Sequence, residues 1–172
     1  MRIACVVLLL LAASHDASAQ MSDRDVAEKV AGKLRGYAQF SIFDDVNASV
    51  SAGIVTLSGS VTTPLKRDEI NDRIAKVEGV RRLVCDVRVL PVSQADANLR
   101  VRVAQAIYGH PAFWPYASMA RPPIHIIVEA GHVSLIGVVN SEVERSLAYA
   151  LAQVPGAFSV TNCLRLDKSP AG

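Results

Sequence analysis

The side chains that most often carry enzyme chemistry are few in this sequence, and their spacing does not group them. Beyond the first twenty residues the histidines are His110, His125 and His132. A metal site would need ligands at a spacing such as His-x-x-x-His on a helix, and no cysteine or acid accompanies these histidines in that way. We therefore expect no metal site and interpret them as surface or loop residues.

Acid–base, nucleophilic and nucleotide chemistry also lack a pattern. The adjacent acids Asp44-Asp45 and Asp68-Glu69 fall on a predicted loop and a polar helix face, where solvation explains them better than paired acid–base catalysis. Ser58 lies in "TLSGS" within a predicted strand and lacks the flanking glycines of a nucleophile elbow. The sequence thus predicts no catalytic residue, no cofactor and a protein that is not an enzyme.

The cysteines beyond the first twenty residues are predicted to lie on different faces of separate domains. Cys85 alternates in phase with Val87 and Val89 and should face the core, whereas Cys163 alternates with Thr161 and should face outward. A disulfide needs Cα atoms within about 7 Å, so an internal bond is disfavoured. A bond between two chains through an exposed Cys163 is the alternative.

The start of the chain has the pattern of an export signal. Arg2 precedes the apolar run "IACVVLLLLAA", and Ala17-Ser18-Ala19 places small residues where a signal peptidase acts. We predict a signal peptide over residues 1–19, with an N-terminal membrane anchor as the alternative. Cys5 lies inside the apolar run and forms no lipoprotein signal. We therefore expect an exported protein, in solution or peripheral to a membrane.

Length and charge limit the remaining possibilities. The chain has 172 residues, enough for one ordinary domain or two small ones. Its 18 basic and 16 acidic residues leave a formal charge of +2, which is too balanced to indicate a nucleic-acid partner.

One short pattern occurs twice, as "GIVTLSGSV" from Gly53 and "GHVSLIGVV" from Gly131. Each copy follows a helical pattern and an alternating strand, and each precedes a second helix and a last strand. The sequence predicts an α+β protein with two tandem α-β-β-α-β modules, each a small three-stranded mixed sheet with two helices packed on one face. The expected boundaries are residues 22–90 for the first module, 91–96 for a linker, 97–167 for the second module and 168–172 for a flexible tail.

Four glycines of the repeat are predicted to be structural. Gly53 and Gly131 fall in tight turns that need a positive φ. Gly59 and Gly137 fall inside strands, where glycine indicates the close approach of another backbone.

These residues resemble a known family. The order of helix, "V-x-V", turn glycine, "V-[TS]-L-x-G", helix and "GV" before a last strand is similar to the BON module (bacterial OsmY and nodulation). The first copy fits closely, whereas the second has Ala157 in place of the usual valine and a longer aromatic loop. The resemblance implies an exported, non-enzymatic envelope protein linked to osmotic or envelope stress. Several family members are thought to contact phospholipid or other proteins, and the family shares no catalytic residues.

The outer face of the second predicted sheet differs from that of the first. Strand alternation places Ile127, Ile136 and Val138 on this face, where the first copy has serines. Exposed together, three aliphatic side chains would form the kind of apolar patch that marks an interaction site. Docking of this face onto the first module is the alternative, and it would leave no exposed site.

The segment before that sheet, "YGHPAFWPYASMARPP", is rich in aromatic residues. It contains Tyr108, Phe113, Trp114 and Tyr116, with Arg121 close by. Aromatic rings beside a cation suit a membrane interface. Packing of the rings on their own sheet, as expected for Phe40 and Phe43 in the first copy, is one alternative, and a protein or dimer contact is another.

The sequence therefore leads to a functional hypothesis without bond chemistry. We expect the second module to bind phospholipid surfaces or envelope proteins, with a homo-oligomer possible. The expected location is the periplasm, and the expected contact residues are Tyr108, Phe113, Trp114, Tyr116, Arg121, Ile127, Ile136 and Val138. The alternative is a stress-induced periplasmic chaperone or protein-interaction module without lipid affinity.

Overall fold

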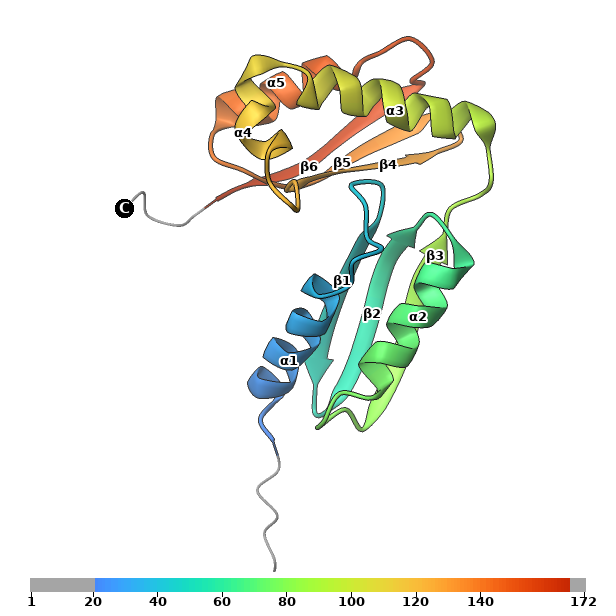
Figure 1. Cartoon of the computed structure of the whole chain (residues 1–172), viewed down its shortest axis with the longest axis vertical. Coiled ribbons are helices and arrows are strands. Elements are labelled where there is room, and N and C mark those ends of the chain that lie inside the picture. The colour runs from blue at the N-terminus through green and yellow to red at the C-terminus, as the bar shows by residue number, and fades with distance from the viewer. Residues whose placement is uncertain (1–20, 168–172) are drawn as a thin grey trace, which may run out of the picture.

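The structure is a computed structural model that describes residues 21–167, so the predicted signal peptide and flexible tail lie outside the described residues. Two modules follow one another, and the second lies across the end of the first (Figure 1). The first consists of α1 (Asp23–Arg35), β1 (Asp45–Ser51), β2 (Ile54–Val61), α2 (Pro64–Ala75) and β3 (Arg82–Val89). The second consists of α3 (Gln94–Tyr108), η1 (Pro111–Phe113), α4 (Trp114–Ala117), β4 (Ile124–Glu129), β5 (His132–Val139), α5 (Glu142–Ala152) and β6 (Ser159–Leu166).

The two sheets share one topology. β1 pairs antiparallel with β2, which pairs parallel with β3, and β4, β5 and β6 repeat this order. In each module the two long helices lie on one face of the sheet (Figure 1). The predicted α+β class with two tandem mixed-sheet modules is confirmed.

Short polar side chains begin the long helices. Thr63 and Ser141 accept hydrogen bonds from the backbone N–H groups of Lys66 and Glu144, as helix N-caps do. Ser93 caps α3 in the same way, so α3 begins at Gln94. Residues 94–96 of the expected linker (91–96) are therefore helical. Ser93 resembles a linker residue in the sequence, but it is the N-cap of α3.

Each hairpin turn is held by an aspartate from the preceding helix. Ala52 and Gly53 have φ angles of 50° and 73°, and the Asp23 carboxylate accepts from both of their N–H groups at 2.6 and 2.8 Å. In the second module Asp96 accepts from the N–H groups of Ala130 and Gly131 at 2.9 Å each. A charged acceptor thus fixes two adjacent left-handed residues in both copies.

The strand glycines mark close backbone approaches. A Cβ on Gly59 would lie 2.1 Å from the carbonyl oxygen of Asp45, and one on Gly137 would lie 1.8 Å from that of Pro123. Their φ angles are 121° and 132°, which other residues rarely adopt. The second hairpin strand therefore passes too close to the start of its neighbour for any side chain.

Each module has its own hydrophobic core. Two expectations about side-chain direction need correction. Cys85 is exposed although it alternates with buried Val87, because β3 is an edge strand with no neighbour beyond it. The spacing of Val143, Leu147 and Leu151 predicts a buried apolar stripe on α5, but Val143 in the first turn is 76% exposed. The fully buried residues of this helix are Ala148 and Ala152.

We predict that Gly137→Ala lowers the free energy of unfolding by about 3 kcal/mol, because it combines backbone strain with a clash against a main-chain oxygen. Urea denaturation measures the effect. Gly32→Ala is the matched control: Gly32 lies in α1 with no atom near its added Cβ, so the substitution should be neutral or stabilise by up to about 1 kcal/mol. Equal stability of the two variants would contradict the proposed close approach.

Candidate interaction surface

The aromatic segment between α3 and β4 forms two short helical turns. Gly109 ends α3, and the His110 Nδ1 accepts from the N–H of Ala112 at the start of η1. Trp114 begins α4 directly after η1. The segment predicted as a long loop is thus a compact structure that holds its rings in defined positions.

Three of its four aromatic rings pack inward. Phe113 is fully buried, Tyr116 is 5% exposed, and half-buried Tyr108 packs against the same core. The Tyr116 hydroxyl donates to Glu144 at 2.6 Å and accepts from the N–H of Asn140 at 3.0 Å. Burial and the Glu144 carboxylate raise the pKa of Tyr116 to about 12. These rings are structural, which is the packing alternative of the sequence analysis.

Trp114 alone among the four rings points outward. Its side chain is 60% exposed, and its indole N–H donates to the Gly109 carbonyl at 3.2 Å. Met119 is 47% exposed and Arg121 is exposed in the same segment. We call Trp114, Met119 and Arg121 the exposed triad. Met119 was not among the residues predicted from the sequence, where only its position between Trp114 and Arg121 pointed to it.

The apolar outer face of the second sheet is partly covered by the first module. His125 and Glu129 lie on this face, and each contacts the first module, through the Asp44 carbonyl at 2.6 Å and Arg88 at 3.1 Å. Ile127 lies between them on the same face and is 7% exposed. The prediction of an exposed apolar patch is therefore wrong for Ile127. Docking of this face onto the first module, which was the alternative, accounts for the burial of Ile127.

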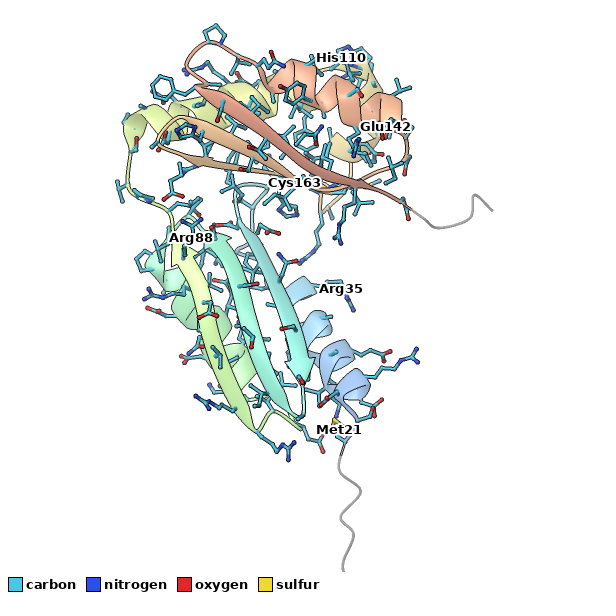
Figure 2. The ribbon with its side chains drawn as sticks, turned by 180° about the vertical axis from the view of Figure 1, so that it is seen from behind. Met21, Arg35, Arg88, His110, Glu142 and Cys163 are labelled. Carbon is cyan, nitrogen blue, oxygen red and sulfur yellow. The ribbon has the colours of Figure 1, made fainter. Side chains whose placement is uncertain are left out.

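The rest of that outer face is less enclosed. Ile136 and Val138 are half-buried on β5. In the first module, Ser60 of β2 is only 5% exposed, and its hydroxyl accepts a long hydrogen bond from Arg88. Ser60 is one of the serines on the outer face of the first sheet, and it lies where the modules meet. Figure 2 shows Arg88 at this junction and Cys163 on the sheet of the second module.

The loop before β1 makes the junction, and we call residues 40–44 the docking loop. Phe40 packs on the first core, as expected, but Ile42 and Phe43 pack on the core of the second module. The Ile42 carbonyl also accepts from the N–H of Ile126 at 2.7 Å. The docking loop therefore serves both modules.

The free edge of β4 is capped along its length. The Tyr108 hydroxyl donates to the Ile124 carbonyl at 2.6 Å, Ile42 accepts from Ile126, and Arg100 donates to the Val128 carbonyl at 2.7 Å. Arg100 is only 8% exposed, and this burial lowers its pKa, partly offset by Asp96 and Asp44. Capped in this way, β4 is not available for pairing with another strand.

A buried aspartate holds the docking loop. Asp44 is 1% exposed, and its carboxylate accepts from Ser41, from Thr62 and from Lys66, whose Nζ lies 2.6 Å away. Burial alone would raise the pKa of Asp44, but these hydrogen bonds outweigh it and hold the pKa below its usual value of 3.8. The sequence analysis interpreted Asp44 as a solvated acid, because an adjacent pair of acids does not reveal which one is buried.

In the described part of the chain, no group of three or more histidine, cysteine or acidic side chains is placed to hold a metal ion. His125 bonds to the Asp44 carbonyl of the first module, and His132 bonds to the Ser159 hydroxyl on the neighbouring strand. Both Cys85 and Cys163 are free and exposed. Among residues 21–167, no helix has the length and apolar character needed to cross a bilayer.

Known proteins match the repeated unit. The sequence model of the BON domain matches residues 22–91 and again residues 95–168. No curated protein is significantly similar to the chain. Two structures of CdsD, a structural protein of the type III secretion system of Chlamydia trachomatis, resemble it weakly. One, of the C-terminal domain, has 17% identity and a TM-score of 0.35 and covers 85% of this chain and 67% of that chain. The other has 14% identity and a TM-score of 0.30, and the match covers 83% of this chain and 92% of that chain.

We predict that Asp44→Asn lowers the free energy of unfolding by about 2 kcal/mol at pH 7, because hydrogen bonds to a buried charge are lost. The folded pKa of Asp44 is depressed, so its contribution is fully present above pH 3.8 and is lost as the pH falls through the lower folded value. The difference between the variant and the original protein should therefore shrink below pH 3.8.

Urea unfolding at neutral and acid pH measures this difference. Asp45→Asn is the matched control, because among residues 21–167 the Asp45 side chain accepts a hydrogen bond from the exposed Asn47 amide and forms no ion pair. A difference that stays constant down to pH 2, or an equal loss in the control, would show that Asp44 does not anchor the loop.

Proposed function

The chain belongs to the BON-domain family, and we propose that it is a non-enzymatic protein of the periplasm that binds phospholipid surfaces through its second module. BON-domain proteins are associated with the cell envelope and with osmotic stress. Other envelope components, including proteins or a second copy of the chain, are further partners in this proposal. The observation that carries it is the exposed triad.

The exposed triad has the side chains that a membrane interface favours. A tryptophan lodges at the level of the lipid headgroups, and a guanidinium binds phosphate through two donors at once. The indole N–H of Trp114 already bonds to Gly109, so the exposed part of the ring is mainly apolar. Exposed Met119 adds flexible apolar surface from the same segment.

The surroundings of the exposed triad favour a fixed contact site over a mobile loop. Phe113 and Tyr116 on either side of Trp114 are buried, and the Tyr116 hydroxyl is tied to Glu144 on α5. The ring is therefore presented from a rigid base, which lowers the entropy lost on binding. The outer sheet face contributes less than the sequence predicted, because Ile127 is buried at the junction.

Cosedimentation with vesicles that contain an anionic phospholipid tests the proposal. We expect Trp114→Ala to weaken binding roughly tenfold through lost apolar burial, and Arg121→Ala roughly fivefold through one lost charge contact. Phe158→Ala is the matched control, because Phe158 is an aromatic residue 80% exposed beside the Gly131 turn, at the opposite end of the sheet.

Vesicle binding that is absent, or that the Phe158 variant reduces as much as the Trp114 variant, would refute the lipid-binding site. Suppression of aggregation of a denaturing client by a protein that leaves vesicles unbound would instead support the chaperone alternative.

A further inference from the structure

We propose that the cleft between the two modules binds a soluble, single-chain amphiphile with an anionic head, such as a long-chain carboxylate or alkyl phosphate. This site shares Arg121 with the membrane contact proposed above but does not include Trp114 or Met119. It includes residues of the first module and takes a free molecule, not the surface of a bilayer.

The cleft is built from both modules. Its volume is about 460 Å³, and its walls come from the end of α1, the docking loop and the start of β1 on one side, and from residues 120–123 and His125 on the other. Neither module encloses the space alone. A volume of this size lies in the lower part of the range of about 300–1,000 Å³ for small-molecule sites, which favours one aliphatic chain over two.

Two arginines line the cleft from opposite walls. Arg35 ends α1, and Arg121 precedes the prolines that lead into β4. Both are exposed, and neither forms an ion pair with any residue between 21 and 167. Figure 2 shows Arg35 at the end of α1 that lies toward the second module.

The acidic residues of the cleft leave an excess of positive charge. Asp44 is neutralised by Lys66, with Nζ at 2.6 Å, and has no exposed surface on its side chain. Asp45 remains as a carboxylate that accepts from the Asn47 amide. Two free guanidinium groups against one carboxylate favour an anionic ligand, and guanidinium donors match carboxylate and phosphate oxygens.

Most of the remaining lining is apolar, and Ser41 and His125 are its polar members. The apolar residues are Leu34, Phe40, Ile42 and Val46 from the first module and Ala120, Pro122 and Pro123 from the second. An inorganic anion would leave this surface in contact with water, whereas an aliphatic chain would cover it. The anionic head would contact the two arginines, and the aliphatic chain would cover the apolar residues of the same cleft.

Isothermal titration calorimetry with decanoate and with decyl phosphate, each below its micelle concentration, tests the proposal. We expect one site per chain. Decanol, which lacks the charge, and inorganic phosphate, which lacks the chain, should each bind at least tenfold more weakly. The two anionic probes distinguish a carboxylate from a phosphate headgroup.

Variants locate the site. Arg35→Ala and Arg121→Ala should each weaken decanoate binding at least fivefold, and Arg24→Ala at the other end of α1 should leave it unchanged. All three arginines are exposed, so the variants should keep the melting temperature of the original protein. Absence of binding, equal binding of decanol, or binding that Arg35→Ala does not change would overturn the inference.

Failure here is distinguishable from failure of the membrane proposal. Trp114→Ala should weaken vesicle binding and leave decanoate binding intact, whereas Arg35→Ala should weaken decanoate binding and leave vesicle binding intact. Vesicle binding without any decanoate binding would refute the cleft site alone.

Discussion

The burial of the Asp44 carboxylate is the constraint on which the arrangement of the two modules depends. A buried charge is tolerated only when it is paired and its acceptor positions are filled. Ser41, Thr62 and Lys66 fill them, and in doing so they fasten the docking loop to the end of β2 and the start of α2. With its side chain held inside the first module, Asp44 presents its main-chain carbonyl to His125 of the second.

The two modules share one solution for their internal structure and differ where they meet. Both hold a left-handed turn with an aspartate from the preceding helix, and both use a glycine where two strands cross closely. They diverge on the outer face of the sheet. Serines on the outer face of the first sheet are replaced by aliphatic residues on the outer face of the second sheet. The end of the first module that carries the docking loop covers part of this aliphatic surface. The repeated unit thus accounts for the fold, and the altered outer face of the second sheet accounts for the junction.

The junction also determines what the protein can present to a ligand. It covers Ile127 and contributes one of the caps on the free edge of β4, which reduces the surface that other partners can use. It creates a cleft with arginines on both walls, which a single module does not possess. The segment before β4 packs three of its aromatic rings on the core and leaves Trp114 exposed. Binding in this protein is therefore proposed at the margins of the modules, away from their sheets and cores.

The sequence by itself determined the fold, because local signals and their repetition agree. Period-two and helical patterns, caps such as Thr63 and the glycines of the repeat each report on neighbours close along the chain, and the structure confirms the α+β class and the two modules. Only the tertiary structure decided which candidates are exposed. Alternation assigns Ile127 and Ser60 to an outer face but is silent on whether another module covers that face. The same limit applies to Asp44, Phe43 and Arg35, whose roles arise from contacts between distant segments, and those contacts depend on packing that no local pattern encodes.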